Sequence, residues 1–84
     1  MLVKRLKEEL KGDYIYGIKK QEESYNLTCW SGSDCKKYIV YITGKKEINE
    51  MNNILKEARE LNINPLDYLN FSINETGKVY NYFN

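Results

Sequence analysis

The chain has 84 residues, of which 42% are hydrophobic and 30% are charged. A chain of this length has room for one core, and its apolar share is enough to build that core, so we expect a single domain over residues 1–84. Thirteen basic and twelve acidic residues give a net charge of +1. This balance excludes the strongly basic composition of a dedicated duplex-DNA binder and the strongly acidic composition of a DNA mimic.

The first residues of the sequence favour a cytoplasmic protein. Charge at Lys4 and Arg5 comes before any apolar segment of a secretory signal can form. No stretch reaches the roughly 20 apolar residues that a membrane span needs. We therefore expect no membrane partner, and cysteines that are kept reduced.

A first helix is predicted over residues 2–11. Its apolar side chains recur at spacings of three and four residues and so share one side. They are Leu2, Val3, Leu6 and Leu10. Gly12 follows directly and suits the left-handed conformation that ends a helix. A helix this short is stable only when it is packed, so its apolar side should lie against the rest of the domain.

Three strands are predicted next, over residues 13–19, 24–31 and 35–43. Short polar turns join them, which predicts an antiparallel meander. Strict alternation would place Tyr14, Tyr16 and Ile18 on one side of the first strand, and Asp13, Ile15, Gly17 and Lys19 on the other.

The second and third strands divide in the same way. Their more apolar sides carry Tyr25, Leu27 and Cys29, and Tyr38, Val40 and Ile42. Their opposite sides carry Asn26, Thr28 and Trp30, and Ile39 and Tyr41. A core on the Leu27 side is expected.

The clearest element is a helix over about residues 46–61. One side of it is apolar and should pack on the sheet: Ile48, Met51, Ile54, Leu55, Ala58 and Leu61. Asn62 can adopt the left-handed conformation that closes a helix, and Pro65 prevents continuation. Asn64 before Pro65 resembles a new N-cap, which predicts one further helical turn over residues 65–69.

A closing hairpin is predicted from residues 70–74 and 78–83, around a turn at residues 75–77. The predicted fold class is therefore α+β. It is a three-stranded antiparallel meander packed by an N-terminal and a longer central helix, with a C-terminal hairpin.

The usual residues of catalysis and metal binding are missing from this sequence. It contains no histidine, and two cysteines cannot complete a four-ligand zinc site in one chain. No glycine-rich phosphate-binding motif is present. We expect a protein that is not an enzyme, with no catalytic residue, no metal and no cofactor.

Cys29 and Cys35 flank the turn between the second and third predicted strands, where cross-strand neighbours can come close enough to bridge. Two interpretations follow. They are small, half-buried thiols, or they form a redox switch or an intermolecular bridge.

Aromatic residues are frequent, with eight Tyr, two Phe and one Trp. Most of the tyrosines are expected to pack in the sheet with their hydroxyls reaching solvent. Trp30 differs, because it shares the side opposite Leu27 with Ile39 and Tyr41. If helices cover only the Leu27 side, these three residues form an apolar patch typical of a protein-binding surface. In the alternative, the C-terminal hairpin covers this side with Phe71, Val79 and Phe83.

Three lysine pairs lie at the ends of predicted strands and helices: Lys19 and Lys20, Lys36 and Lys37, and Lys45 and Lys46. One interpretation is solvated strand edges that resist aggregation. The other is a nucleic-acid-binding surface, in which the lysines contact phosphates beside exposed tyrosines.

The segment over residues 6–14, Leu-Lys-Glu-Glu-Leu-Lys-Gly-Asp-Tyr, and the element order of the first 60 or so residues resemble small phage-encoded anti-CRISPR proteins. Those proteins inhibit effector nucleases of type II systems by occupying nucleic-acid or domain-motion surfaces. The resemblance implies a phage or mobile-element inhibitor whose partner is a larger host defence protein. The net charge of +1 favours steric or allosteric binding over DNA mimicry. The alternative function is a small nucleic-acid-binding accessory protein that uses the lysine pairs and tyrosines.

Overall fold

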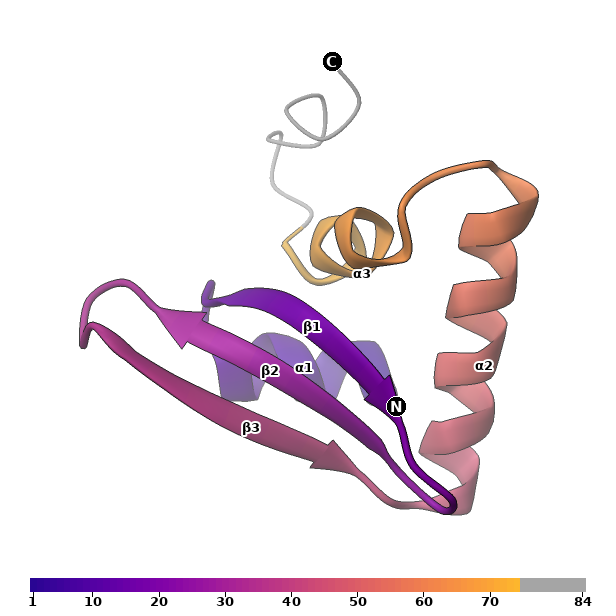
Figure 1. Ribbon diagram of the computed structural model, residues 1–84, viewed down its shortest axis with the longest axis horizontal. Coiled ribbons are helices and arrows are strands. Elements are labelled where there is room, and N and C mark those ends of the chain that lie inside the picture. Colours follow the sequence, from indigo (N-terminus) through magenta and orange to yellow (C-terminus); the bar gives the residue numbers. More distant parts are fainter. Residues whose placement is uncertain (75–84) are drawn as a thin grey trace.

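The computed structural model describes residues 1–74 and shows an α+β fold (Figure 1). Its elements in chain order are α1 (Leu2–Leu10), β1 (Tyr14–Lys20), β2 (Tyr25–Ser31), β3 (Lys36–Ile42), α2 (Lys45–Glu60) and α3 (Pro65–Ile73). The predicted α+β class and the first five elements are confirmed. None of the helices among residues 1–74 has the length and apolar character that a membrane crossing requires.

The three strands form one antiparallel sheet in the order β1-β2-β3. The buried residues of β2 and β3 alternate with exposed or half-buried ones. They are Tyr25, Leu27, Cys29 and Ser31, and Val40 and Ile42. The predicted division of these two strands into a core side and an outer side is therefore confirmed.

Strand β1 departs from strict alternation at Tyr16. Ile15 pairs with Cys29, and Gly17 pairs with Thr28, so Tyr16 is an extra residue in a β-bulge. Beyond the bulge the alternation restarts one residue later, which turns Ile15 and Ile18 toward the same core. The predicted sides of β1 are therefore confirmed up to Tyr16 and wrong beyond it, because Ile18 lies on the core side and Gly17 and Lys19 lie on the opposite side. Ile15 is fully buried, whereas Tyr14 is 44% exposed.

All three helices lie on the core side or along the rim of the sheet (Figure 1). Helix α1 is behind the sheet in this view, and its apolar side is completely buried at Leu2, Leu6 and Leu10. Helix α2 buries Met51 and Ala58 and packs Ile48, Ile54 and Leu55 against the core as half-buried residues. Leu61 ends the helix and is 55% exposed, so its predicted place in the packed side was wrong.

Helix α3 begins as predicted and continues further than predicted. The Asn64 side chain accepts a hydrogen bond of 2.8 Å from the Leu66 N–H, and Pro65 takes the first helical position. The helix then runs to Ile73, so the predicted strand over residues 70–74 is wrong. The predicted strand over residues 78–83 lies outside the described residues.

The physical reason for this difference is helical spacing. Leu66, Leu69 and Ile73 follow one another at intervals of three and four, which places them on one side of a helix. Asn70 falls on the same side and interrupts the apolar pattern. Leu69, Asn70 and Ile73 are all buried on this side of α3.

The side chain of Asn70 is fully buried and binds the free edge of β1. Its Oδ1 accepts a hydrogen bond of 3.0 Å from the Ile15 N–H, and its Nδ2 donates one of 2.8 Å to the Ile15 carbonyl. Nδ2 also donates to the Leu66 carbonyl at 2.9 Å. The amide thus occupies the place that a fourth strand would take at this residue.

We predict that Asn70→Asp strongly destabilises the fold. The substitution keeps the size of the side chain but replaces the donating amide nitrogen with a carboxylate oxygen, which then faces two carbonyl oxygens that have lost their donor. Each buried polar group left unsatisfied costs about 1–3 kcal/mol. The loss should shrink as the pH falls, because a protonated carboxyl group regains a donor. Urea unfolding followed by circular dichroism measures it. Asn49→Ala, at an exposed position of α2, is the control. An unchanged midpoint for Asn70→Asp at neutral pH would contradict this assignment.

Candidate functional site

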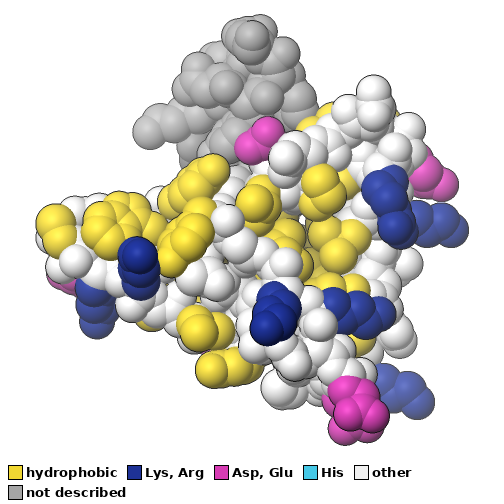
Figure 2. All heavy atoms as spheres, in the orientation of Figure 1, with side chains coloured by type: hydrophobic (Ala, Val, Ile, Leu, Met, Phe, Trp, Pro, Cys, Tyr) yellow, Lys and Arg dark blue, Asp and Glu magenta, His cyan; other side chains and the backbone are white. Residues whose placement is uncertain are grey.

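The side of the sheet opposite the helices is a candidate interaction surface, which we call the outer sheet face. Its residues are Tyr14, Tyr16, Gly17 and Lys19 of β1, Asn26, Thr28 and Trp30 of β2, and Lys37, Ile39 and Tyr41 of β3. In the view of Figure 1 this face is turned toward the reader. Figure 2 shows hydrophobic side chains gathered over the strands in the same orientation.

The strand register brings the exposed aromatic residues together from three strands. Tyr14 pairs with Trp30, and Trp30 pairs with Lys37, so the tryptophan lies in the middle of one row across the sheet. Asn26 separates Lys19 from Tyr41 in another row. Trp30 is 38% exposed and Tyr41 is 53% exposed. Both indoles and phenols offer a large apolar area together with a polar group, which suits binding surfaces.

The sequence placed Trp30, Ile39 and Tyr41 on a shared side, and the structure brings these three residues onto the outer sheet face. Sequence reasoning missed Tyr14 and Tyr16, which it placed on the side of Ile18. A signal was present in the sequence. Ile15 and Ile18 are apolar residues three apart in a strand, and Gly17 stands between them, which is typical of a bulge.

The outer sheet face is not covered by any helix among residues 1–74. In the competing interpretation, Phe71 covered Trp30 as part of a hairpin. Phe71 lies instead in α3, where its ring is tilted against that of Tyr68 with 6.4 Å between the centroids. Val79 and Phe83, the other members of that predicted cover, lie outside the described residues.

The six lysines of the predicted nucleic-acid surface are divided among several places. Lys19 and Lys37 lie on the outer sheet face, and Lys20 lies on the core side, where its Nζ is 5.6 Å from the centroid of the Tyr25 ring. Lys36 pairs with Ser31 at the far end of the sheet. The remaining two, Lys45 and Lys46, begin α2. The structure therefore brings only two of the six onto one face with the exposed tyrosines.

The two cysteines are both free. Cys29 is completely buried on the core side, whereas Cys35 is exposed in the turn between β2 and β3. Burial raises the pKa of the Cys29 thiol to about 11, and the nearby Asp13 carboxylate adds to this effect. A thiol with a raised pKa holds little reactive thiolate at neutral pH, so Cys29 has the properties of a core residue.

We predict that Cys29 weakens the fold in alkali. Its pKa is higher in the folded chain than in the unfolded one, so its stabilising effect is complete below the unfolded value and is lost as the pH rises from about 9 to about 11. A shift of this size corresponds to on the order of 2–3 kcal/mol. Unfolding free energies measured across this range should fall less steeply for Cys29→Ala than for Cys35→Ala, which removes the exposed thiol. Equal slopes for the two variants would show that Cys29 ionises as freely as Cys35.

Within residues 1–74, no three side chains of Asp, Glu or Cys are grouped closely enough to hold a metal ion. No protein family, curated protein or solved structure matches this chain.

Proposed function

We propose that the chain is a non-enzymatic protein-binding module whose outer sheet face docks on a larger protein. The observation that carries this proposal is the group of exposed apolar residues on the outer sheet face, which no helix among residues 1–74 covers. Trp30, Ile39 and Tyr41 are joined there by Tyr14 and Tyr16, with exposed fractions between 38% and 53%. Several large apolar side chains exposed together are typical of an interaction site.

The backbone beneath this surface supports the same function. Each of the three strands is hydrogen-bonded to its neighbour, and the opposite side is fixed by the buried core. Aromatic side chains on a rigid sheet lose little conformational entropy when a partner covers them. Trp30 lies between Tyr14 and Lys37 in the three-stranded row nearest the β2–β3 turn, and tryptophan is among the residues that dominate binding interfaces.

The resemblance in element order to small anti-CRISPR proteins supports a role as a phage or mobile-element inhibitor of a host defence protein. A CRISPR type II effector nuclease is therefore the first partner to test. The net charge of +1 supports steric or allosteric docking through the aromatic face rather than imitation of DNA.

The test replaces Trp30, which is the single tryptophan of the chain. Binding of the purified effector to an immobilised chain is measured together with its DNA-cleavage rate. We expect Trp30→Ala to weaken binding by about 30-fold, since a central aromatic residue contributes about 2 kcal/mol or more. The free energy of unfolding should change by less than about 1 kcal/mol, because Trp30 contributes only cross-strand pairing.

Leu61→Ala is the matched control, since Leu61 is a similarly exposed apolar residue at the end of α2, away from the sheet. It should leave binding unchanged. The affinity should also change little between about 50 and about 200 mM salt, because the docking surface is mainly apolar. If Leu61→Ala weakens capture as much as Trp30→Ala does, the outer sheet face is not the docking surface. If the effector neither binds nor is inhibited, this partner is wrong.

A second function is favoured by one specific observation. Lys19 and Lys37 share the outer sheet face with the tyrosines, and none of its ten residues is acidic. Lys19 pairs with Asn26 and Lys37 pairs with Trp30. These two β2 residues are four positions apart, so the two lysines are separated by about 14 Å along the strand direction. Single-stranded nucleic acid can stack its bases on aromatic residues between such charges.

This second function predicts steep salt dependence. Single-stranded DNA should quench the fluorescence of Trp30, and the affinity should fall between about 50 and about 200 mM salt as counterions are released. Lys37→Glu should then abolish binding. Micromolar binding of this kind at physiological salt would place nucleic acid ahead of a protein partner.

A further inference from the structure

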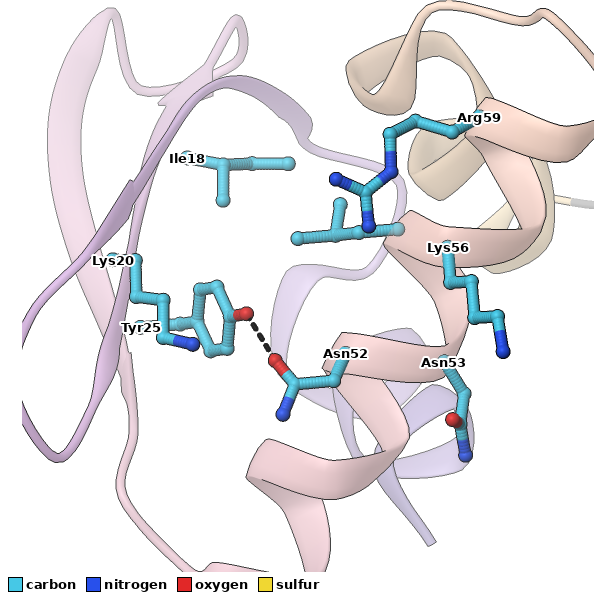
Figure 3. Close-up of a pocket in the computed structure, with 8 residues that line it drawn as sticks. Ile18, Lys20, Tyr25, Asn52, Asn53, Lys56 and Arg59 are labelled. Carbon is cyan, nitrogen blue, oxygen red and sulfur yellow. Dashed lines mark hydrogen bonds between the residues drawn. The ribbon is translucent and has the colours of Figure 1, made fainter.

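A second surface lies on the other side of the sheet, in a cleft between the ends of β1 and β2 and the side of α2 that faces these strands (Figure 3). Its volume is about 490 Å³, which is within the range of small-molecule sites. Lys20 and Tyr25 come from the strands, while Asn52, Leu55 and Arg59 come from successive turns of α2. Because the sheet separates this cleft from Trp30, it is distinct from the outer sheet face.

The inner wall of the cleft is apolar. Ile18 and Leu55 are half-buried residues that pack against the core, and each leaves part of its side chain facing the opening. The same two residues and Arg59 also line an adjoining cavity of about 240 Å³ that reaches Pro65. A flat apolar group of moderate size can therefore be covered by aliphatic side chains from β1 and α2.

The rim of the cleft is positively charged on both sides. Lys20 stands on the strand side, and Arg59 reaches from α2 toward Ile18 in Figure 3, while Lys56 extends from the outer side of the same helix. These three cations make no ion pair with any of residues 1–74, in contrast to Arg5, which pairs with Glu9 and Glu47.

Acidic side chains near the cleft are directed elsewhere. No carboxylate of residues 1–74 lines it. Glu57 of α2 accepts a hydrogen bond from Tyr68 of α3, and Glu22 and Glu23 line a separate cavity with Lys45. The carboxyl end of α2 contributes a partial negative charge of about one half, which three full positive charges outweigh. The cleft therefore favours an anion.

Polar donors complete the site. Tyr25 donates its hydroxyl hydrogen to Oδ1 of Asn52. This bond holds the Asn52 amide across the cleft and leaves its Nδ2 hydrogens without a partner among residues 1–74. An amide of this kind can donate to the edge of a heterocyclic base.

We propose that this cleft binds a nucleoside phosphate. The base lies against Ile18 and Leu55 with Asn52 donating to its edge, and the phosphate is held by Arg59 together with Lys20 on the strand side of the opening. A guanidinium group suits the phosphate because it offers paired N–H donors in one plane. The inference goes beyond the protein-binding function, because it concerns a small ligand on a separate surface.

The test is a calorimetric titration of the full chain with adenosine monophosphate, inorganic phosphate and adenosine at low salt. We expect adenosine monophosphate to bind at least tenfold more tightly than either fragment, since it alone uses both the apolar wall and the cations. Arg59→Gln and Lys20→Gln should each weaken its binding by about tenfold, as loss of a charge-assisted hydrogen bond does. Lys4→Gln, at an exposed lysine of α1, is the charge-matched control and should leave binding unchanged.

Trp30 separates this inference from the proposed function. Nucleotide binding in the cleft should leave the fluorescence of Trp30 unchanged and should persist in Trp30→Ala. Equal affinities for the nucleotide and either fragment, no binding near 1 mM, or quenching of Trp30 by the nucleotide would each overturn the assignment. Partner docking is tested with Trp30→Ala and nucleotide binding is tested with the cleft variants, so the protein-binding proposal and the nucleotide proposal can fail independently.

Discussion

The hydrogen bonds between the Asn70 side chain and the backbone of Ile15 are the constraint on which the rest of the structure depends. Strand β1 is at the edge of the sheet, so its outward N–H and carbonyl groups need partners. At Ile15 those groups are buried by α3, and water cannot reach them, so the amide of Asn70 supplies both partners. One polar residue in the core thereby fixes the position of α3 against the sheet.

The bulge at Tyr16 follows directly after this anchored residue, and both candidate surfaces depend on it. Without the extra residue, Ile18 would point away from the core side and the apolar wall of the cleft would be lost. The same extra residue turns Gly17 and Lys19 outward, so that Lys19 joins the face that carries Tyr14 and Tyr16. A bulge thus shapes the two sides of the sheet at once, which is a recurrent use of bulges near binding sites.

Most of the fold could be predicted from the sequence because its signals are local. The spacing of Leu2, Leu6 and Leu10, the alternation in β2 and β3, and the Asn62 and Pro65 breaks are each visible within a few residues. The outer sheet face was predicted in part for the same reason, through Trp30, Ile39 and Tyr41.

Two features that the sequence did not show arise from contacts between distant residues. Asn70 lies in the core because it meets Ile15, which is 55 positions earlier in the chain, and no local pattern shows this. The cleft joins Lys20 to Arg59 across the gap between a strand and a helix. Its cations are ordinary surface lysines and arginines in the sequence, and only the packing of α2 against β1 and β2 brings them to one opening.

Two lysines that are adjacent in the sequence can lie on opposite sides of a sheet, because successive residues of a strand point in opposite directions. Lys19 and Lys20 are adjacent, yet alternation sends the first to the outer sheet face and the second to the cleft. A net charge of +1 likewise conceals an uneven distribution. Among residues 1–74, no carboxylate lies on the outer sheet face or in the cleft, whereas α1 and the β1–β2 turn carry Glu8, Glu9, Glu22 and Glu23. Because the local potential rather than the total charge governs which ligands approach, two surfaces that prefer different partners can coexist on a nearly neutral chain.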